Sequence, residues 1–190
     1  MGKLFTSDKE DASSRQRLLK RARMFLGSHV GPEWDWRQGD LTAIDIAAYA
    51  AGSRFQAELR SDFYRHPAGY KKLGGVANTP EAPYFFRRYS NILHFMRRKN
   101  AFYARGEKRP QPGMVMVLDW PEERGRFNFS PDRIGVVLEV ENERVSKGIL
   151  ALPAPSGWVV AEVHVLANSP SDRLVIGYGD LPCDEEKTET

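Results

Sequence analysis

The apolar pattern of this chain changes near Gly113, and that change constrains the fold more than any other feature. Before it, apolar residues recur at helical spacing, as in the stripe that contains Leu18, Ala22 and Phe25. After it, short continuous or alternating apolar runs follow one another, as is typical of buried strands. Helices first and strands last predict an α+β fold, with N-terminal helices packed on a C-terminal antiparallel sheet.

Capping residues and apolar spacing predict where these elements lie. We expect helices over residues 13 or 14–26, 41–51, 56–64 and 83–100, with a long ordered loop over 66–80 and a basic linker over 105–112. We expect about five strands, over residues 114–118, 134–140, 145–152, 158–166 and 174–178, with a tight turn at 141–143.

The length of 190 residues corresponds to one domain, and 41% hydrophobic residues are enough for its core. We place this domain at residues 13–180, between a flexible tail at 1–12 and a flexible acidic tail at 181–190. No apolar stretch approaches the roughly 18–20 residues that span a bilayer. The first 14 residues lack the apolar segment of a signal peptide. The sequence as written therefore predicts a cytoplasmic location, or a periplasmic or exported one if a leader has been removed.

Residues that could carry chemistry are few and scattered. The single cysteine, Cys183, lies beside acidic residues, which raise a thiol pKa and disfavour the thiolate. The histidines His29, His66, His94 and His164 have no metal-binding spacing. The chain also has no phosphate-binding or dinucleotide-binding loop. We therefore expect neither a metal nor another cofactor.

Several short motifs, in order, give the chain a family resemblance over about residues 18–179. Residues 39–49, Gly-Asp-Leu-Thr-Ala-Ile-Asp-Ile-Ala-Ala-Tyr, resemble a helix entry that reads Gly-Val-Cys-Thr-Asp-Val-Val-Ile-Arg-Ala-Tyr. Asp62 followed by Tyr70 resembles the stretch after that helix. Residues 87–91 match Arg-Arg-x-x-Asn, Pro112 and Gly113 match Pro-Gly-Asp, and residues 134–137 match the strand His-Ile-Gly-Ile-Val.

These motifs resemble a small, usually exported bacterial family within the NlpC-like superfamily of cysteine amidases and peptidases. The resemblance implies a papain-like fold, in which the nucleophilic cysteine begins a helix and the basic histidine lies on a strand. A helix dipole lowers the pKa of such a cysteine.

The departures from the family fall on the positions that do the chemistry. The nucleophile position is Leu41 and the base position is Arg133, which stays protonated and accepts no proton. Two family aspartates are replaced by Ala43 and Met114, and a later His-Asn pair is replaced around residues 152–153. Thr42 does not substitute as nucleophile, because its hydroxyl needs an adjacent base. The sequence therefore predicts a catalytically inactive member that keeps a vestigial cleft.

That cleft could bind a cell-wall peptide, a glycan or a protein partner. The candidate binding residues are Thr42, Arg87, Arg88, Asn91 and Arg133. Arginine suits this task because its planar fork makes paired hydrogen bonds to carboxylates. The alternative for Arg87 and Arg88 is an ion pair with a core-facing carboxylate such as Asp62.

Two other functions stay open at this point. An active hydrolase with rearranged groups needs His94 or His164 near Asp45 or Glu162. A nucleic-acid-binding domain needs a contiguous basic face over residues 15–23 and 97–109, with exposed aromatic rings such as Phe102 and Tyr103. A net charge of only +3 does not by itself imply a nucleic-acid partner.

Overall fold

The computed structural model describes residues 8–30, 46–82, 85–119, 133–155, 157–165 and 175–185. Its helices are α1 (Asp8–Met24), α2 (Ile46–Ala51), α3 (Ser53–Arg65), α4 (Pro67–Gly74), the 3₁₀ turn η2 (Phe85–Arg87) and α5 (Tyr89–Arg98). Its strands are β1 (His29–Val30), β2 (Phe102–Ala104), β3 (Val115–Leu118), β4 (Arg133–Glu141), β5 (Arg144–Ala154), β6 (Gly157–His164) and β7 (Val175–Gly179). The α+β class is confirmed.

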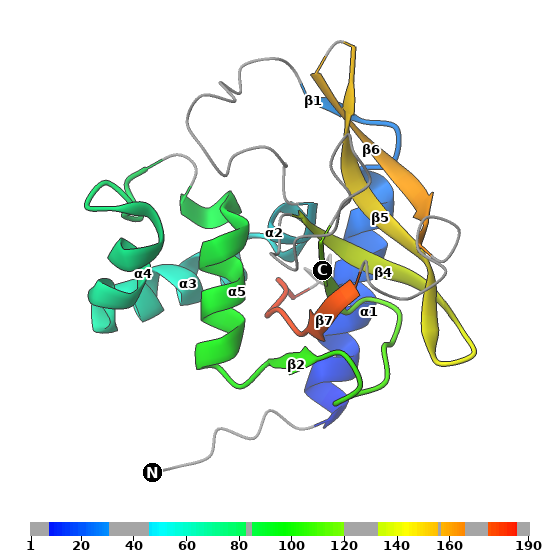
Figure 1. The fold of residues 1–190 in the computed structure, drawn as a ribbon, viewed down its shortest axis with the longest axis horizontal. Coiled ribbons are helices and arrows are strands. Elements are labelled where there is room, and N and C mark those ends of the chain that lie inside the picture. Colours follow the sequence, from blue (N-terminus) through cyan, green and yellow to red (C-terminus); the bar gives the residue numbers. More distant parts are fainter. Residues whose placement is uncertain are drawn as a thin grey trace, which may run out of the picture.

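The strands form one antiparallel sheet in the order β1-β6-β5-β4-β3-β7-β2. Strands β3 to β7 are the five that the apolar runs predict. The two edge strands were not predicted, because β1 has two residues and the residues of β2 are all half-buried. Figure 1 shows the sheet on the right, α3, α4 and α5 on the left, and α2 between them.

Both faces of the sheet are apolar, and this explains the continuous runs in its strands. On β3, Val115 and Val117 face the core that the helices share, whereas Met116 and Leu118 face a second apolar cluster. Successive side chains on a strand point to opposite faces, so burial of both faces requires an unbroken apolar run. Helices α1 and α2 pack against β4 on the helical side.

The helices differ from prediction in three places. Helix α1 begins at Asp8 instead of near Ser13, because the preceding Lys, Glu and Ala are good helix formers. Residues 67–74 form α4, so the predicted loop over 66–80 is wrong there. Pro67 starts this helix instead of breaking it, since a proline in the first turn removes an N–H that has no intrahelical partner.

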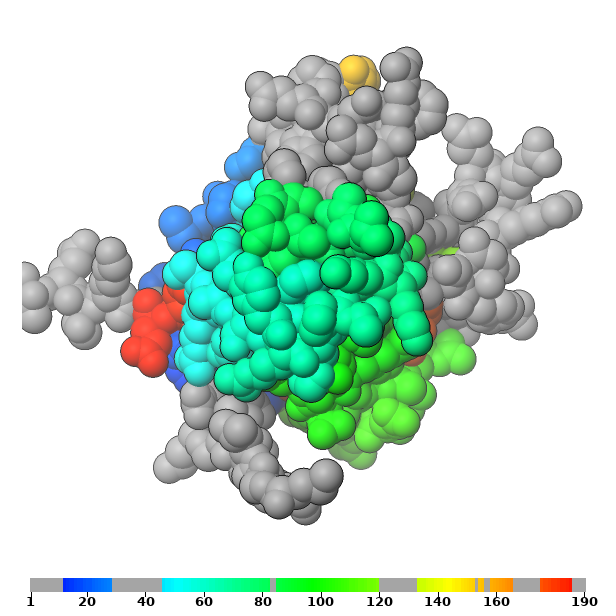
Figure 2. All heavy atoms as spheres, turned by 90° about the vertical axis from the view of Figure 1, so that its left-hand side faces the viewer, coloured from blue at the N-terminus to red at the C-terminus, as the bar shows by residue number. Residues whose placement is uncertain are grey.

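The predicted helix over 83–100 is also interrupted. Arg88 is extended, with φ −74° and ψ 118°, and it separates η2 from α5. Figure 2 shows the face that α3, α4 and the region before α5 present to solvent. Residues 83 and 84 and the first part of the predicted helix over 41–51, residues 41–45, lie outside the described residues.

The chain after β7 does not leave the domain at residue 181. Leu181 and Cys183 are buried, and the backbone N–H of Asp184 donates to the carbonyl of Ala51. The carboxylate of Asp184 accepts hydrogen bonds from the backbone N–H groups of Ser53 and Arg54 at the start of α3. The expectation of a flexible tail is therefore wrong for residues 181–185.

Candidate functional site

The position expected for the catalytic base, Arg133, is the first residue of β4. It pairs in register with Leu118 at the end of β3. Its guanidinium carbon lies 5.5 Å from the centre of the Trp158 ring on β6, a cation–π distance. A permanently charged guanidinium held by an indole ring can bind a carboxylate, but it cannot take up a proton.

Sequence reasoning missed a carboxylate at the same end of the sheet. Asp119 directly follows β3, one position beyond the residue that pairs with Arg133, and it is only 1% exposed. An acidic residue that closes a continuous apolar run is the signal that could have found it. The other two candidates from this part of the resemblance, Leu41 and Thr42, lie outside the described residues, as does Ala43.

Two of the candidate binding residues are too buried to contact a ligand. Asn91 is fully buried, and its side-chain amide exchanges two hydrogen bonds with the amide of Asn78, at 2.8 and 2.9 Å. It also donates to the carbonyl of Phe85. Arg88 is 6% exposed, and its guanidinium packs against Gly74. Both side chains therefore hold the helical layer together, which corrects their assignment as binding residues.

Arg87 is more accessible and contacts α2. Its Nη1 donates a 2.8 Å hydrogen bond to the Tyr49 hydroxyl, and its guanidinium lies 5.9 Å from the Tyr49 ring centre. Helix α2 contacts both η2, which carries Arg87, and β4, which begins at Arg133. The two half-buried candidate arginines, Arg87 and Arg133, are therefore on elements that share α2 as a neighbour.

The ion pair suggested for Arg87 or Arg88 with Asp62 is made by Arg98 instead. The buried Asp62 carboxylate accepts from Arg98 Nε at 2.9 Å and from the Tyr70 hydroxyl at 2.7 Å. Burial, followed by the hydrogen bond to Asp62, raises the pKa of Tyr70 far above its ordinary value. Asp62 and Tyr70, which the resemblance singled out as a pair, thus contact one another in the helical layer.

The described side chains offer no thiol and imidazole that could act together. Cys183 is fully buried, and its thiol lies 3.5 Å from the carbonyl oxygen of Ala50. Burial is the largest cause that raises its pKa. His94 lies edge-on to the Tyr70 ring at 4.7 Å, and burial lowers its pKa. His66 and His164 are exposed, and Asp45 lies outside the described residues.

The residues that the structure describes include no group of three or more His, Cys, Asp or Glu side chains that could hold a metal ion. No described helix is long and apolar enough to cross a membrane.

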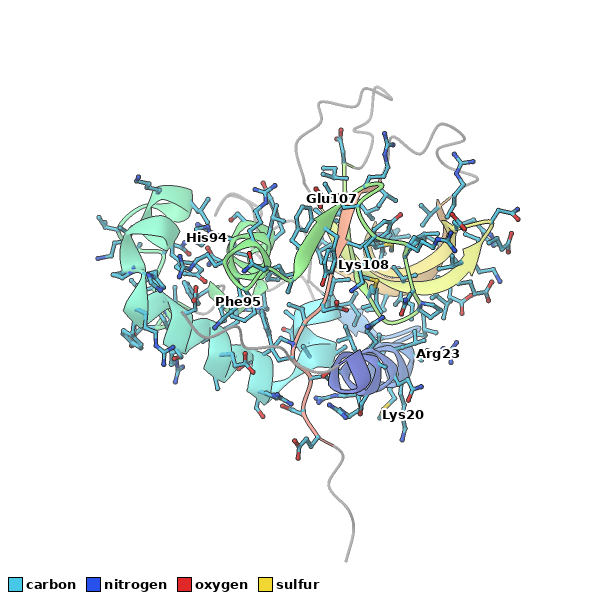
Figure 3. All side chains as sticks on the ribbon, turned by 90° about the horizontal axis from the view of Figure 1, so that it is seen from below. Lys20, Arg23, His94, Phe95, Glu107 and Lys108 are labelled. Atoms are coloured by element: carbon cyan, nitrogen blue, oxygen red, sulfur yellow. The ribbon has the colours of Figure 1, made fainter. Side chains whose placement is uncertain are left out.

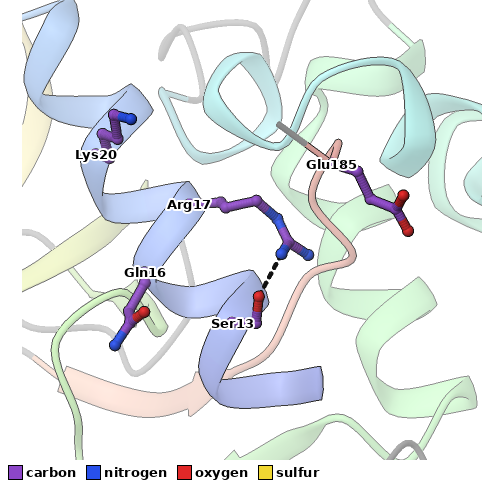
Figure 4. A pocket seen from close by; sticks show the side chains of 5 residues that line it. All are labelled: Ser13, Gln16, Arg17, Lys20 and Glu185. Atoms are coloured by element: carbon purple, nitrogen blue, oxygen red, sulfur yellow. Dashed lines mark hydrogen bonds between the residues drawn. The ribbon is translucent and has the colours of Figure 1, made fainter. Parts of the chain in front are cut away.

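Two hollows carry basic side chains. The α1 hollow, about 490 Å³, is lined by Ser13, Gln16, Arg17, Lys20 and Glu185. Figure 4 shows Arg17 donating to Ser13, with Lys20 and Gln16 on other faces of the helix. The hairpin hollow, about 310 Å³, is lined by Arg105, Gly106, Lys108, Arg109, Pro110, Glu143, Arg144 and Tyr178. Figure 3 shows Lys108 well apart from Lys20 and Arg23 of α1.

The basic segments do not present the stacking surface that single-stranded nucleic acid needs. Arg97 lies over the Phe102 ring at 5.2 Å and Lys108 over the Tyr103 ring at 4.1 Å, so cations cover these half-buried rings. Arg15 is buried and pairs with Asp180 at 3.2 Å. It therefore does not belong to an open basic face.

Searches of protein-family models, of curated proteins and of solved structures each gave no match to this chain.

Proposed function

We propose that this chain is a catalytically inactive relative of the NlpC-like cysteine amidases and peptidases that binds a cell-wall peptide or glycan. The observation that carries the proposal is that the thiol is buried while an arginine occupies the base position. The only thiol of the chain is buried against the Ala50 carbonyl. The position that would carry the base holds a guanidinium over Trp158. Covalent thiol chemistry needs both groups in one cleft.

The packing of α2 supports a papain-like arrangement. In the family that the chain resembles, the nucleophile begins a helix and the base lies on a strand of the sheet. Here α2, which continues the matching helix entry, packs on β4, which begins at Arg133. The core residues Ile46, Ala47 and Ala48 are buried at this contact layer. This contact is what the proposal requires of a scaffold whose reactive side chains have been exchanged.

The side chains around Arg133 suit a stem peptide or a sugar. Arginine makes paired, charge-assisted hydrogen bonds to the carboxylates in which peptides end. The half-buried indole ring of Trp158 lies under the Arg133 guanidinium and orients it, and the N–H edge of the indole is a hydrogen-bond donor that suits a sugar hydroxyl. We place the ligand-contacting residues at the sheet end formed by Arg133 and Trp158, with Arg87 and Tyr49 beside it on η2 and α2.

Sedimentation with purified, dye-labelled peptidoglycan sacculi tests this function. We expect the wild-type protein to co-sediment and to release no dye. Arg133→Ala should weaken binding about tenfold, the effect of one charge-assisted contact, and Arg133→Lys should fall between the two. Arg23→Ala, on the exposed face of α1, is the matched control and should bind as the wild type does.

Any of three outcomes would contradict the proposal. Dye release by the wild-type protein would identify a hydrolase. Absence of co-sedimentation, or equal binding by the wild type and Arg133→Ala at unchanged thermal stability, would remove the cell-wall ligand from this site.

A further inference from the structure

The hairpin hollow lies at the far end of β4 from Arg133. One wall comes from the turn after β2, with Arg105, Lys108 and Arg109, and the other from the β4–β5 turn, with Glu143 and Arg144. Strand β4 has nine residues, so its two ends are eight steps apart, which is roughly 26 Å at about 3.3 Å per residue. The hollow is therefore separate from the site proposed above.

Both turns are held by their own backbones. In the first, Gly106 has φ +91°, and Arg105 and Lys108 form a β-bridge across it. The Glu107 carboxylate accepts from the backbone N–H of Ala104 at 2.7 Å, so it is engaged by the turn. In the second turn, Asn142 and Glu143 have φ 49° and 64°. Two successive positive φ values are typical of a tight type I′ hairpin turn. The basic side chains thus extend from two turns whose backbone conformations are well defined.

The charge in the wall of the hollow is strongly one-sided. Among the described lining side chains, four are cationic and one is a carboxylate, which gives them a net charge of +3. That carboxylate, Glu143, pairs with Arg109 at 2.9 Å, but both side chains are more than half exposed, and water screens such a pair. Lys108 also lies 3.5 Å from Asp180, which Arg15 shares. Convergent charge of one sign in a concave site raises the local concentration of counter-ions.

We propose that the hairpin hollow binds a compact oxyanion with two or more negative charges, phosphate or carboxylate, on a small molecule. Its three arginines offer planar forks that pair with the oxygens of either group. Its volume is at the lower end of that of small-molecule sites, about 300–1,000 Å³. The rings beside it, Tyr178 at 5% exposure and Tyr103 under Lys108, are not available to stack on bases. The wall therefore favours a small anion over single-stranded nucleic acid.

Titration calorimetry on the whole chain tests the site with pyrophosphate and citrate as the two probes. We expect at least one of the two probes to bind. The probe that binds more tightly shows whether the hollow prefers phosphate or carboxylate. Arg144→Gln should weaken that binding about tenfold, because one charged hydrogen-bonding partner is lost. Glu143→Asn should strengthen it several-fold, since asparagine tolerates the left-handed backbone and the only carboxylate among the described lining residues is removed. Arg23→Ala, on the exposed face of α1 and well apart from Lys108 in Figure 3, is the control and should leave it unchanged.

Three results would overturn the proposal. The first is no binding of either probe at low ionic strength. The second is binding that Arg144→Gln and Glu143→Asn leave unchanged while both variants keep the wild-type melting temperature. The third is an oligothymidylate that binds more tightly than both probes and loses affinity in Arg144→Gln, which would assign the wall to nucleic acid. Since Arg133→Ala tests the other end of the sheet, failure here is distinguishable from failure of the proposed cell-wall site.

Discussion

Gly113→Ala is expected to lower the free energy of unfolding by about 4 kcal/mol, near the upper end for a single substitution. Gly113 precedes β3 with φ +83°, a conformation that L side chains adopt at a cost of about 1–2 kcal/mol. A Cβ at this position would lie 2.1 Å from the backbone carbonyl oxygen of Arg15 in α1. The N–H of Gly113 also donates to the carbonyl of Val137 at 2.8 Å. Helix α1 and the sheet would have to separate to accept one methyl group.

Urea denaturation measures this loss, with Gly27→Ala as the matched control. Gly27 follows α1 with φ +79°, but nothing lies within 4 Å of its added Cβ. The control should therefore lose only the conformational cost, about 1–2 kcal/mol. Equal losses for the two variants would show that α1 does not approach the Gly113 turn as closely as described.

Asp184→Ala is expected to lower the free energy of unfolding by about 2–3 kcal/mol, because the charged acceptor of hydrogen bonds from Ser53, Arg54 and Arg21 is lost. Helix α3 begins after Gly52, which has no side chain to cap it. The Asp184 carboxylate replaces that cap, with Arg54 N at 2.6 Å, Ser53 Oγ at 3.0 Å and Arg21 Nη1 at 2.9 Å. Urea denaturation measures the loss, and limited proteolysis should cut the variant near residues 181–185.

The contribution of Asp184 should depend on pH. Burial alone would raise the pKa of its carboxyl, but hydrogen bonds from Arg21, Arg54 and Ser53 together hold it well below the ordinary value of 3.8. The unfolded chain then binds more protons than the folded one below that value, so stability falls as the pH falls. The difference between wild type and Asp184→Asn should be full at neutral pH and shrink below about pH 4.

Glu185→Gln is the control for this pH dependence, since Glu185 is exposed and does not cap α3. A stability gap between wild type and Asp184→Asn that persisted undiminished to pH 2 would contradict the role of the charged carboxylate.

Local sequence information predicted the strands because their signal is local. Each of β3 to β7 contains enough apolar residues to show that it is buried. Helix α4 was missed because Pro67 can either start or break a helix, and the packing of Tyr70 into the core favours the first. Residues 181–185 were missed because acidic composition outweighed the alternation of Leu181 and Cys183, whose burial depends on α2.

The candidate site was predictable to a smaller degree. Arg133 lies at the start of β4 and over the Trp158 ring, and its role in ligand recognition stays a prediction. Asn91 has the residue type expected of a ligand contact, yet its amide is used by Asn78 and Phe85. Partners of that kind are distant in sequence, so no spacing rule identifies them. Asp62 likewise pairs with Arg98, and not with Arg87 or Arg88 of the matched motif as the sequence suggested.

The most direct test of the vestigial-site account is whether residues 41 and 133 face one another. Cysteines placed at both positions, in a Cys183→Ala background, can be treated with dibromobimane, which becomes fluorescent when it bridges two nearby thiols. The control is a second pair at positions 41 and 144, because residue 144 begins β5 and lies beside the end of β4 opposite Arg133. We predict fluorescence for the 41/133 pair alone. No bridging of that pair, although a maleimide labels each single cysteine, would contradict the account and the papain-like arrangement with it.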